Sequence, residues 1–233
     1  MSSRVESSLA LDSVGFEAIM GLENLSGFFR MPSSFRRSPA LGRRAVFLYR
    51  WCRQEKGHDI MANDLIDLIK TRRSVRLYTE EPVSEELLEQ VLEAGTFAPT
   101  GGGHQSPVIV AVTDPETSER LRQLNAAVMG RDADPYYGAP VIVVVLADGG
   151  RSTFVEDGSC VLENLMLAAH ALGLSSCWIH RECEIFDSAE GKALLREWSL
   201  PETLRGVGAI ALGYAAEPEG AAAPRKDGYV VRI

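Results

Sequence analysis

The stretch VIVVVLADGGRSTFVEDGSCVLENLMLAAHALGL, residues 141–174, decides how this chain folds. Its first seven residues are apolar without interruption, which is typical of a strand buried on both faces. The segment from Phe154 to Leu172 then has apolar residues around most of a helix, and Gly173 marks its end. Such a helix must be covered by protein on nearly all sides. A buried strand followed by a buried helix predicts a layered structure of helices and strands.

Helical and strand patterns continue on both sides of this stretch. Before it, we expect helices over residues 61–73, 84–95 and 115–128, and a strand over 108–112. Ser84 is the expected N-cap of the second helix. After it, we expect strands over 176–180 and 207–215, with a helix over 188–200 between them. The predicted fold is an α+β or α/β domain without internal repeats.

The composition narrows the class of protein. With 233 residues, 45% of them hydrophobic, the chain can bury a full core as one large domain or two small ones. Its formal net charge of −8 argues against a nucleic-acid or anionic-membrane binder, because both need a broad basic face. The longest apolar run, PVIVVVLA, is far shorter than the roughly 20 residues that span a bilayer. Four cysteines without CxxC or zinc spacing, and no signal peptide, predict reduced thiols in a cytoplasmic protein.

Residues 1–60 differ from the rest in charge, with about +3 against about −11 for the remainder. Segments rich in Arg and Ser can be targeting presequences, but acids near the start weaken that interpretation here. Met61 opens a well-patterned helix. We therefore expect an N-terminal extension of unknown role, disordered or an over-long start, over 1–60 and a complete domain over 61–233.

Two nucleotide-binding motifs are excluded. GVGAIA, residues 206–211, fits a loose dinucleotide fingerprint, but that fingerprint needs a strand, a tight turn and then a helix. Here the pattern continues into β-like sequence. The chain also has no GxxxxGK[ST] phosphate loop, so a P-loop NTPase is not supported.

The stretch TRRSVRLY, residues 71–78, gathers three arginines around Ser74 in an otherwise acidic chain. A guanidinium group suits phosphate because its planar fork donates two parallel charge-assisted hydrogen bonds. The alternative is a solvated cluster at the end of a helix, where the helix dipole favours cations.

The stretch FAPTGGGHQSP, residues 97–107, is the second candidate for ligand binding. Pro99 ends the preceding helix, and three glycines give a backbone that can lie against a planar ligand or offer its N–H groups. The alternative is an ordinary flexible turn.

Taken together, TRRSVRLY, APTGGGHQSP, GLSSCWIH and GAIALGY in this order resemble the nitroreductase family of FMN-dependent oxidoreductases. The resemblance runs from about Asn63 to Ile233. It implies an intertwined homodimer, in which an α/β sandwich with a mixed sheet is flanked by helices. It also implies that two FMN molecules bind at the subunit interface and that the long helix packs in the dimer core.

The family motifs imply roles for the arginines. Arg72 and Ser74 would bind phosphate and ribityl oxygens of FMN. Arg76 would lie near the pyrimidine edge of the flavin ring, where a fixed positive charge stabilises the reduced form. Arg73 has the least defined role.

The other implied contacts come from four segments. The glycine loop of a second subunit would line the flavin, the CWIHR stretch would cross the ring, and a C-terminal loop would close on the phosphate. A helix after the first core strand would add a weaker contact. The residues are Pro99, Thr100, Gly101 and Gln105 in the loop, Trp178, Ile179 and His180 in CWIHR, Asn125 on the helix, and Arg225 or Lys226 at the C-terminus.

The resemblance implies an enzyme that takes hydride from NADH or NADPH and reduces nitroaromatic, quinone or related conjugated acceptors by a ping-pong mechanism. No catalytic side chain is expected, because the flavin carries the chemistry, and no histidine has metal-ligand spacing. Its partners would be a second copy and a small-molecule acceptor, without nucleic acid or membrane. Two alternatives remain: the same fold used for reductive dehalogenation or flavin cleavage, and a non-catalytic flavin-binding or sensory protein.

Overall fold

A computed structural model of the chain describes residues 62–233. The predicted extension over 1–60, and its boundary at Met61, lie outside the described residues. The elements in chain order are α3 (Ala62–Thr71), α4 (Glu85–Thr96), the 3₁₀ turn η2 (Gly101–Gly103), β1 (Val108–Val112), α5 (Pro115–Met129), β2 (Val141–Asp148), α6 (Phe154–Ala171), β3 (Ser175–Ile179), α7 (Glu182–Asp187), α8 (Ala189–Glu197) and β4 (Leu204–Gly213).

The four strands form one sheet in the order β1-β2-β4-β3, and every neighbouring pair is antiparallel. A parallel bridge between Ser74 and Ser176 adds the segment after α3 to the free edge of β3. An antiparallel bridge joins Tyr78 to Ala215. With these bridges the sheet is mixed, as predicted.

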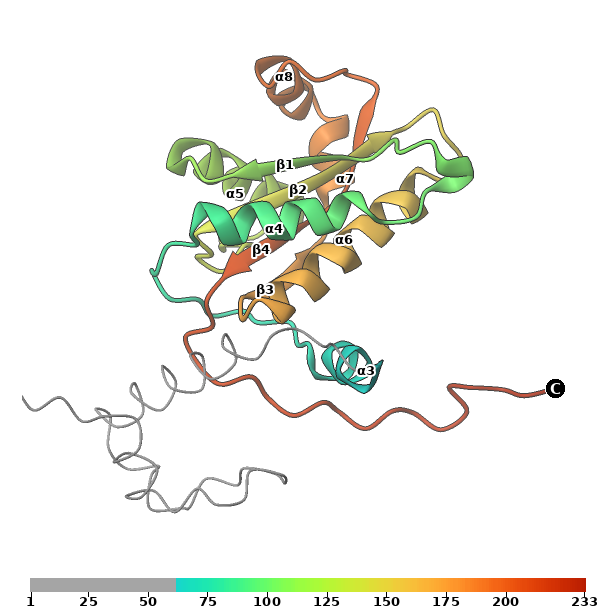
Figure 1. The fold of residues 1–233 in the computed structure, drawn as a ribbon. Helices are drawn as coiled ribbons and strands as arrows, with labels where there is room; N and C mark the ends of the chain where they lie inside the picture. Colours follow the sequence, from blue (N-terminus) through green and yellow to red (C-terminus); the bar gives the residue numbers. More distant parts are fainter. Residues whose placement is uncertain (1–61) are drawn as a thin grey trace, which may run out of the picture. The chain divides into compact units, whose positions relative to one another are not determined.

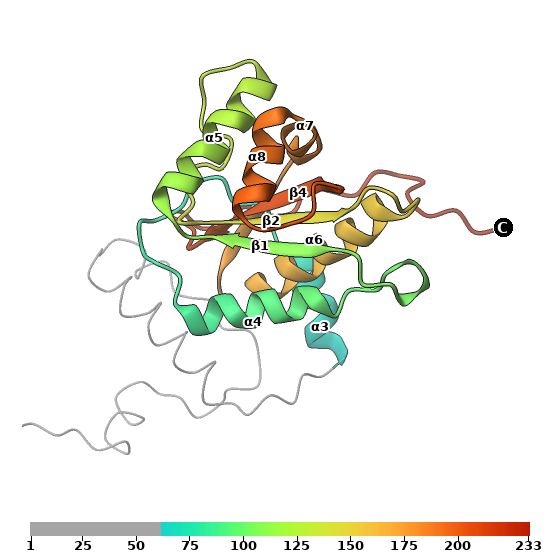
Figure 2. The same ribbon diagram turned by 90° about the horizontal axis from the view of Figure 1, so that it is seen from above.

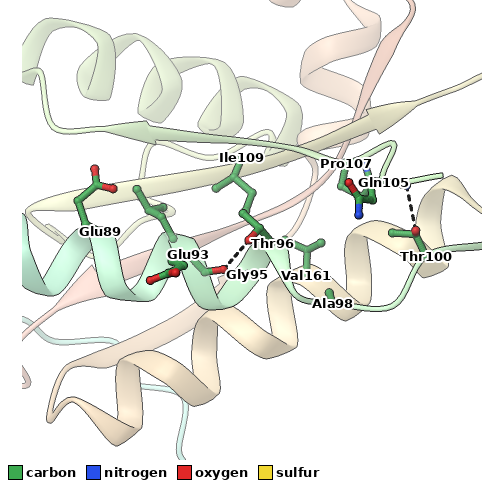
Figure 3. A pocket seen from close by; sticks show the side chains of 11 residues that line it. Glu89, Glu93, Gly95, Thr96, Ala98, Thr100, Gln105, Pro107, Ile109 and Val161 are labelled. Atoms are coloured by element: carbon green, nitrogen blue, oxygen red, sulfur yellow. Dashed lines mark hydrogen bonds between the residues drawn. The ribbon is translucent and has the colours of Figure 1, made fainter. Parts of the chain in front are cut away.

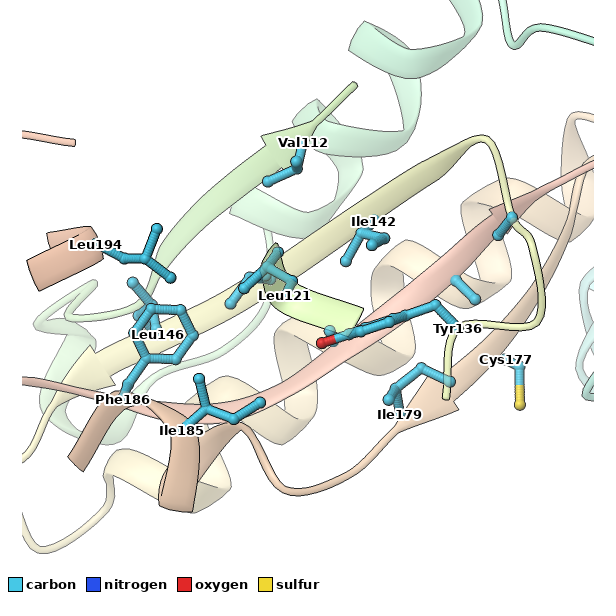
Figure 4. Packing of buried hydrophobic residues seen from close by; sticks show 14 of the residues in the cluster. Val112, Leu121, Tyr136, Ile142, Leu146, Cys177, Ile179, Ile185, Phe186 and Leu194 are labelled. Atoms are coloured by element: carbon cyan, nitrogen blue, oxygen red, sulfur yellow. The ribbon is translucent and has the colours of Figure 1, made fainter. Parts of the chain in front are cut away.

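Strand β2 is buried on both faces, and its alternating side chains build two separate cores. Val141, Val143, Val145 and Ala147 belong to one cluster, which contains the apolar side of α6. The residues between them, Ile142, Val144 and Leu146, belong to the other cluster with Tyr136 and Phe186 (Figure 4). This alternation follows from the two-residue period of a strand.

Helices cover both faces of the sheet. In Figures 1 and 2, α4 and α6 lie on one side, and α5, α7 and α8 lie on the other. The result is a three-layer α/β sandwich, which confirms the predicted fold class. Within residues 62–233, no helix combines the length and the apolar character needed to cross a membrane.

Most predicted elements are confirmed within a few residues of their expected ends. Ser84 is the N-cap of α4, and its hydroxyl accepts a hydrogen bond from the Leu87 amide. GVGAIA lies inside β4, so its rejection as a dinucleotide fingerprint is confirmed. The helix expected over 188–200 is wrong at its C-terminal end: α8 stops at Glu197, and Ser199 has a left-handed φ of 56° that a helix cannot contain. Helix α7, with six residues, was not predicted from the sequence.

The packing of α6 generates a prediction about stability. Leu162 is fully buried between α6 and the sheet, whereas Val128 on α5 is 41% exposed. We expect Leu162→Ala to lower the free energy of unfolding by about 2–5 kcal/mol, because it removes buried methyl groups and leaves a cavity. Val128→Ala should change it by about 0.5 kcal/mol or less. Urea unfolding of both variants measures this, and equal effects would contradict the assigned packing.

Candidate functional site

The arginine-bearing segment lies in an extended conformation along the edge of β3. The Val75 amide donates to the Ser176 carbonyl at 3.1 Å, beside the Ser74–Ser176 bridge. Tyr78 is buried, and its hydroxyl donates to the carbonyls of Val75 at 2.8 Å and Ala211 at 3.1 Å. These contacts fix the backbone that carries the arginines against the sheet.

Arg73 has a different position from its neighbours. Its Nη1 donates to the Lys70 carbonyl at 2.7 Å, in the last turn of α3. That carbonyl is one of the groups that a helix C-terminus leaves without an intrahelical partner. The helix-capping alternative considered for the whole cluster therefore describes Arg73 itself.

Arg72, Ser74 and Arg76 all interact with the thiol of Cys177 on β3. Alternate residues of an extended segment point to the same side, so this spacing allows all three to approach one neighbour. Burial raises the pKa of Cys177, while the charge of Arg76, a hydrogen bond with Ser74 and the charge of Arg72 all oppose the rise. A cationic cluster is thus assembled from three of the predicted residues.

This cluster contains unsatisfied hydrogen-bonding capacity. Arg72 Nη1 is buried and has no hydrogen-bond partner among residues 62–233. A buried guanidinium nitrogen without an acceptor is costly, because it has lost water and gained nothing in exchange. Arg76 is exposed, and its guanidinium carbon lies 6.0 Å from the centroid of the Tyr137 ring. The cluster suits an anionic ligand, which from solvent would meet the exposed Ser74 and Arg76 first.

The glycine loop is anchored to the first turns of α6 by a carboxylate that the sequence analysis missed. Asp157 is 3% exposed, and its Oδ1 accepts from the Gly101 amide at 2.7 Å. Its Oδ2 accepts from Thr153 Oγ1 at 3.2 Å and Ser106 Oγ at 3.5 Å. Its position gave no signal, because Asp157 stands in the first turn of α6, where the helix dipole favours acids. These hydrogen bonds order the loop, so it is not a flexible turn.

Gly101 is required by close approach to α6. A Cβ at this position would lie 2.5 Å from Thr153 Oγ1. Next to it, Thr100 Oγ1 accepts from the Gln105 amide at 3.0 Å (Figure 3). Thr100 and Gln105 line a groove of about 460 Å³ that runs along α4. Glu89 and Glu93 also line it, and two carboxylates suit a neutral ligand better than a phosphate.

The arginine cluster and the glycine loop are attached to opposite ends of α6. Thr71, which directly precedes the arginines, has its Oγ1 3.0 Å from His170 Nε2, whereas the loop is anchored at Asp157. At a rise of about 1.5 Å per residue, the two anchor residues lie about 20 Å apart along the helix. One chain therefore does not bring these two predicted parts of the site together.

The CWIHR stretch joins the arginine side. Trp178 and Ile179 lie on β3, directly after Cys177, and the exposed His180 follows the strand. Asn125, the predicted weaker contact, is fully buried, and its side-chain amide donates to the His180 carbonyl at 3.0 Å. Its hydrogen-bonding groups are thus used inside the protein.

The predicted C-terminal residues make local contacts. Arg225 Nη2 donates to the Ala223 carbonyl at 2.6 Å, and Lys226 Nζ lies 5.4 Å from the centroid of the Tyr229 ring. Both belong to the exposed segment that ends the chain (Figure 1). In the described part of the chain, no group of His, Cys, Asp and Glu side chains is arranged to hold a metal ion.

Comparison with known proteins assigns the family. The model of the Nitroreductase family matches residues 69–214, which contain the arginine segment, the glycine loop and β3. The chain belongs to the nitroreductase family. A relative from Methanothermobacter thermautotrophicus, whose name pairs NADH dehydrogenase with NAD(P)H nitroreductase, is 32% identical over 162 residues. That match covers 67% of this chain and 80% of the relative.

Solved nitroreductase structures share the fold. The FMN-bound nitroreductase of Bacteroides fragilis superposes with a TM-score of 0.68 at 30% identity, and the match covers 74% of this chain and 100% of that one. An FMN-dependent nitroreductase of Clostridium difficile R20291 gives a TM-score of 0.62 at 28% identity, with 72% of this chain and 98% of that chain covered. Both matches confirm the predicted nitroreductase-like fold.

The role of Asp157 can be tested by hydrogen exchange. In Asp157→Ala the amide of Gly101 loses its acceptor inside the protein, a loss of about 1–3 kcal/mol. We expect the amides of the glycine loop to exchange faster by one to two orders of magnitude, while those of β2 keep their parent rates. Glu156→Ala, which changes the exposed neighbour on the same helix turn, is the control. Unchanged protection at Gly101 in Asp157→Ala would refute the anchor.

Proposed function

We propose that this nitroreductase-family protein is an NAD(P)H-dependent FMN oxidoreductase that reduces nitroaromatic, quinone or related conjugated acceptors by a ping-pong mechanism. When bound, FMN supplies the chemistry of accepting a hydride and passing two electrons on. The protein would position the flavin, tune its redox potential and leave one face of the ring open to the hydride donor and the electron acceptor. The observation that carries the proposal is the buried and unpaired Arg72 Nη1 within the Arg72–Ser74–Arg76 cluster.

Arg72 and Ser74 would hold the phosphate end of the cofactor. A phosphate oxygen would give Arg72 Nη1 the acceptor that it lacks, and Ser74 adds a hydroxyl on the same segment. Arg225 or Lys226 would close on the phosphate from the C-terminal segment. Arg73, whose guanidinium caps α3, would contribute charge to this end of the site and not a direct bond.

The ring of the cofactor would lie against the end of β3. Arg76 would face its pyrimidine edge, and the backbone of Trp178, Ile179 and His180 would face its reactive edge. A positive charge that is already fixed beside the ring favours electron uptake, because no solvent or side chain must reorganise when the charge develops.

A homodimer would complete the site. Because the glycine loop lies about 20 Å along α6 from the arginine cluster, Pro99, Thr100, Gly101 and Gln105 would act on the cofactor held by a second copy. Exposed apolar side chains support association: Leu65, Ile66 and Ile69 on α3 are 51, 48 and 47% exposed, and Phe97 beside the loop is 77% exposed. Such surfaces mark interaction sites in folded proteins.

The cofactor assignment is tested by isolating the protein. We expect yellow protein with one FMN per subunit, measured by absorbance and by the flavin released on denaturation. Sedimentation should give a dimer. Colourless protein that takes up no added FMN would remove the basis of the proposal.

The two arginines should separate binding from redox tuning. Arg76→Ala should keep FMN but make the flavin harder to reduce; a loss of about 1.4 kcal/mol for the reduced form equals a fall of roughly 30 mV in midpoint potential. Arg72→Ala should weaken FMN retention with a smaller shift, because the charge of the phosphate does not change on reduction. Redox titration and FMN dissociation constants of both variants measure this. If Arg76→Ala lost FMN at an unchanged potential, the two roles would have to be exchanged.

Steady-state oxidation of NADH or NADPH with a quinone acceptor separates this function from a flavin-binding module without turnover. Reductive dehalogenation would differ from this function in the acceptor, and flavin cleavage in using the flavin as substrate, so intact FMN recovered after turnover with a quinone would count against cleavage.

A further inference from the structure

A buried polar network lies directly behind the junction of β3 and α7. Asn125, Tyr136 and Glu182 are all 0% exposed. Glu182 Oε1 accepts hydrogen bonds from Tyr136 Oη at 2.7 Å and from Asn125 Nδ2 at 3.2 Å. Its Oε2 is buried without a hydrogen-bond partner among the described residues. Burial raises the pKa of Glu182 to about 7, although the bonds from Tyr136 and Asn125 oppose the rise.

The residue between His180 and Glu182 has an unfavourable backbone conformation. Arg181 has φ 82° and ψ 6°, in the left-handed region that glycine adopts without strain. Its side chain is tied down: Nε donates to Asn125 Oδ1 at 2.8 Å. Strained residues of this kind persist only where the surroundings hold them in place.

Asn125 fixes the peptide between His180 and Arg181 from two sides. Its Nδ2 donates to the His180 carbonyl at 3.0 Å, and its Oδ1 accepts from the Arg181 side chain. In a trans peptide the N–H points away from the C=O. Because the carbonyl faces the buried network, the N–H of Arg181 is directed away from it. The network therefore sets the direction of a backbone donor at the end of β3.

Glu182, the next residue along the chain, is also held in position. A Cβ at position 206 would lie 2.2 Å from the Glu182 carbonyl oxygen, so the backbone of Glu182 packs directly on Gly206 of β4. Side-chain hydrogen bonds hold one side of the junction, and backbone contact holds the other. Reorientation of the 180–181 peptide would have to break one of these contacts.

We propose that Asn125 and Arg181 are positioning residues for the flavin, and that they act from behind the ring by fixing the 180–181 peptide, with Glu182 anchoring Asn125. The inference rests on the proposed function, in which the end of β3 faces the reactive edge of the ring. It gives Asn125 a role other than the direct flavin contact expected from the sequence. It also gives Arg181, which the sequence analysis did not select, a specific task.

Arg181→Gly separates the side-chain tether from the backbone conformation. Glycine adopts the left-handed region freely, so the backbone conformation is kept. The bond to Asn125 is lost, together with a positive charge that acts on Glu182 and Tyr136. We expect one FMN per subunit as in the parent protein, with a shift of the flavin midpoint potential and a fall in kcat of about tenfold. A tenfold change in the relative binding of reduced and oxidised flavin corresponds to about 30 mV for a two-electron couple. KM for the nicotinamide donor should change less than kcat.

Asn125→Ala should give a shift in the same direction, and the double variant should fall short of the sum of the two single effects, because both remove one interaction. Ser199→Gly is the control for relieving a left-handed residue elsewhere, and Gln123→Ala is the control on the exposed side of α5. Both controls should keep the parent potential and kcat. If Asn125→Ala does not fold, Arg181→Gly is compared with Arg181→Lys, which keeps the charge: a shift in both variants supports the positioning role, and a shift in Arg181→Gly alone would come from the lost charge and refute it.

The outcomes distinguish the two proposals. If the parent binds FMN and Arg181→Gly keeps its potential and kcat, this inference is overturned while the proposed function stands. If the parent takes up no FMN, both are overturned. A potential that shifts equally in Ser199→Gly would also refute the positioning role, because the effect would then come from general backbone changes.

Discussion

The burial of β2 on both faces is the constraint on which the rest of the structure depends. Val141 to Ala147 alternate between two apolar cores, and each core needs a helical layer to exclude water. Helix α6 covers one face together with α4, and α5 with α7 covers the other. Because α6 runs along one face of the sheet, its two ends lie far apart on that face. The two ends then hold the two candidate ligand-binding segments.

The length of α6 keeps the two candidate ligand-binding segments of one copy apart. Asp157 near its start holds the glycine loop, and His170 near its end contacts the residue that precedes the arginines. No side-chain rearrangement can bring segments together over about 20 Å of rigid helix. A ligand that needs both segments must bind where two copies meet. Binding of such a ligand and assembly of the dimer would then stabilise each other, because a ligand that binds only the assembled state shifts the equilibrium towards it.

Periodicity predicts the large elements here, and interactions between distant residues determine what it cannot predict. The helices α4 and α6 repeat an apolar pattern over more than eight residues, β2 is apolar over its first seven, and all three were found where they were expected. Helix α7 has six residues, which is too short for a helical period to be recognised. The network of Asn125 with Tyr136 and Glu182 joins three separate parts of the chain, so no local pattern could have indicated it. Asp157 stands beside Glu156 in the first turn of α6, where the helix dipole favours acids, so the sequence did not mark it as an anchor.

The three arginines of TRRSVRLY illustrate why residue type alone does not assign roles within a motif. Arg73 uses its guanidinium on the last turn of α3, so its charge serves the fold. Arg76 lies by the Tyr137 ring and stays exposed, which leaves its charge available to a neighbouring ligand. Arg72 keeps a buried nitrogen without a hydrogen-bond partner among residues 62–233, which costs folding free energy. The folded protein therefore already holds Arg72 Nη1 in position before an anionic ligand binds. Binding then costs less entropy, because the arginine side chain does not have to be ordered. Arg73 Nε also lacks a partner, but Arg73 Nη1 is already bonded to α3. Of the three, Arg72 is therefore the one whose position is best explained by a ligand.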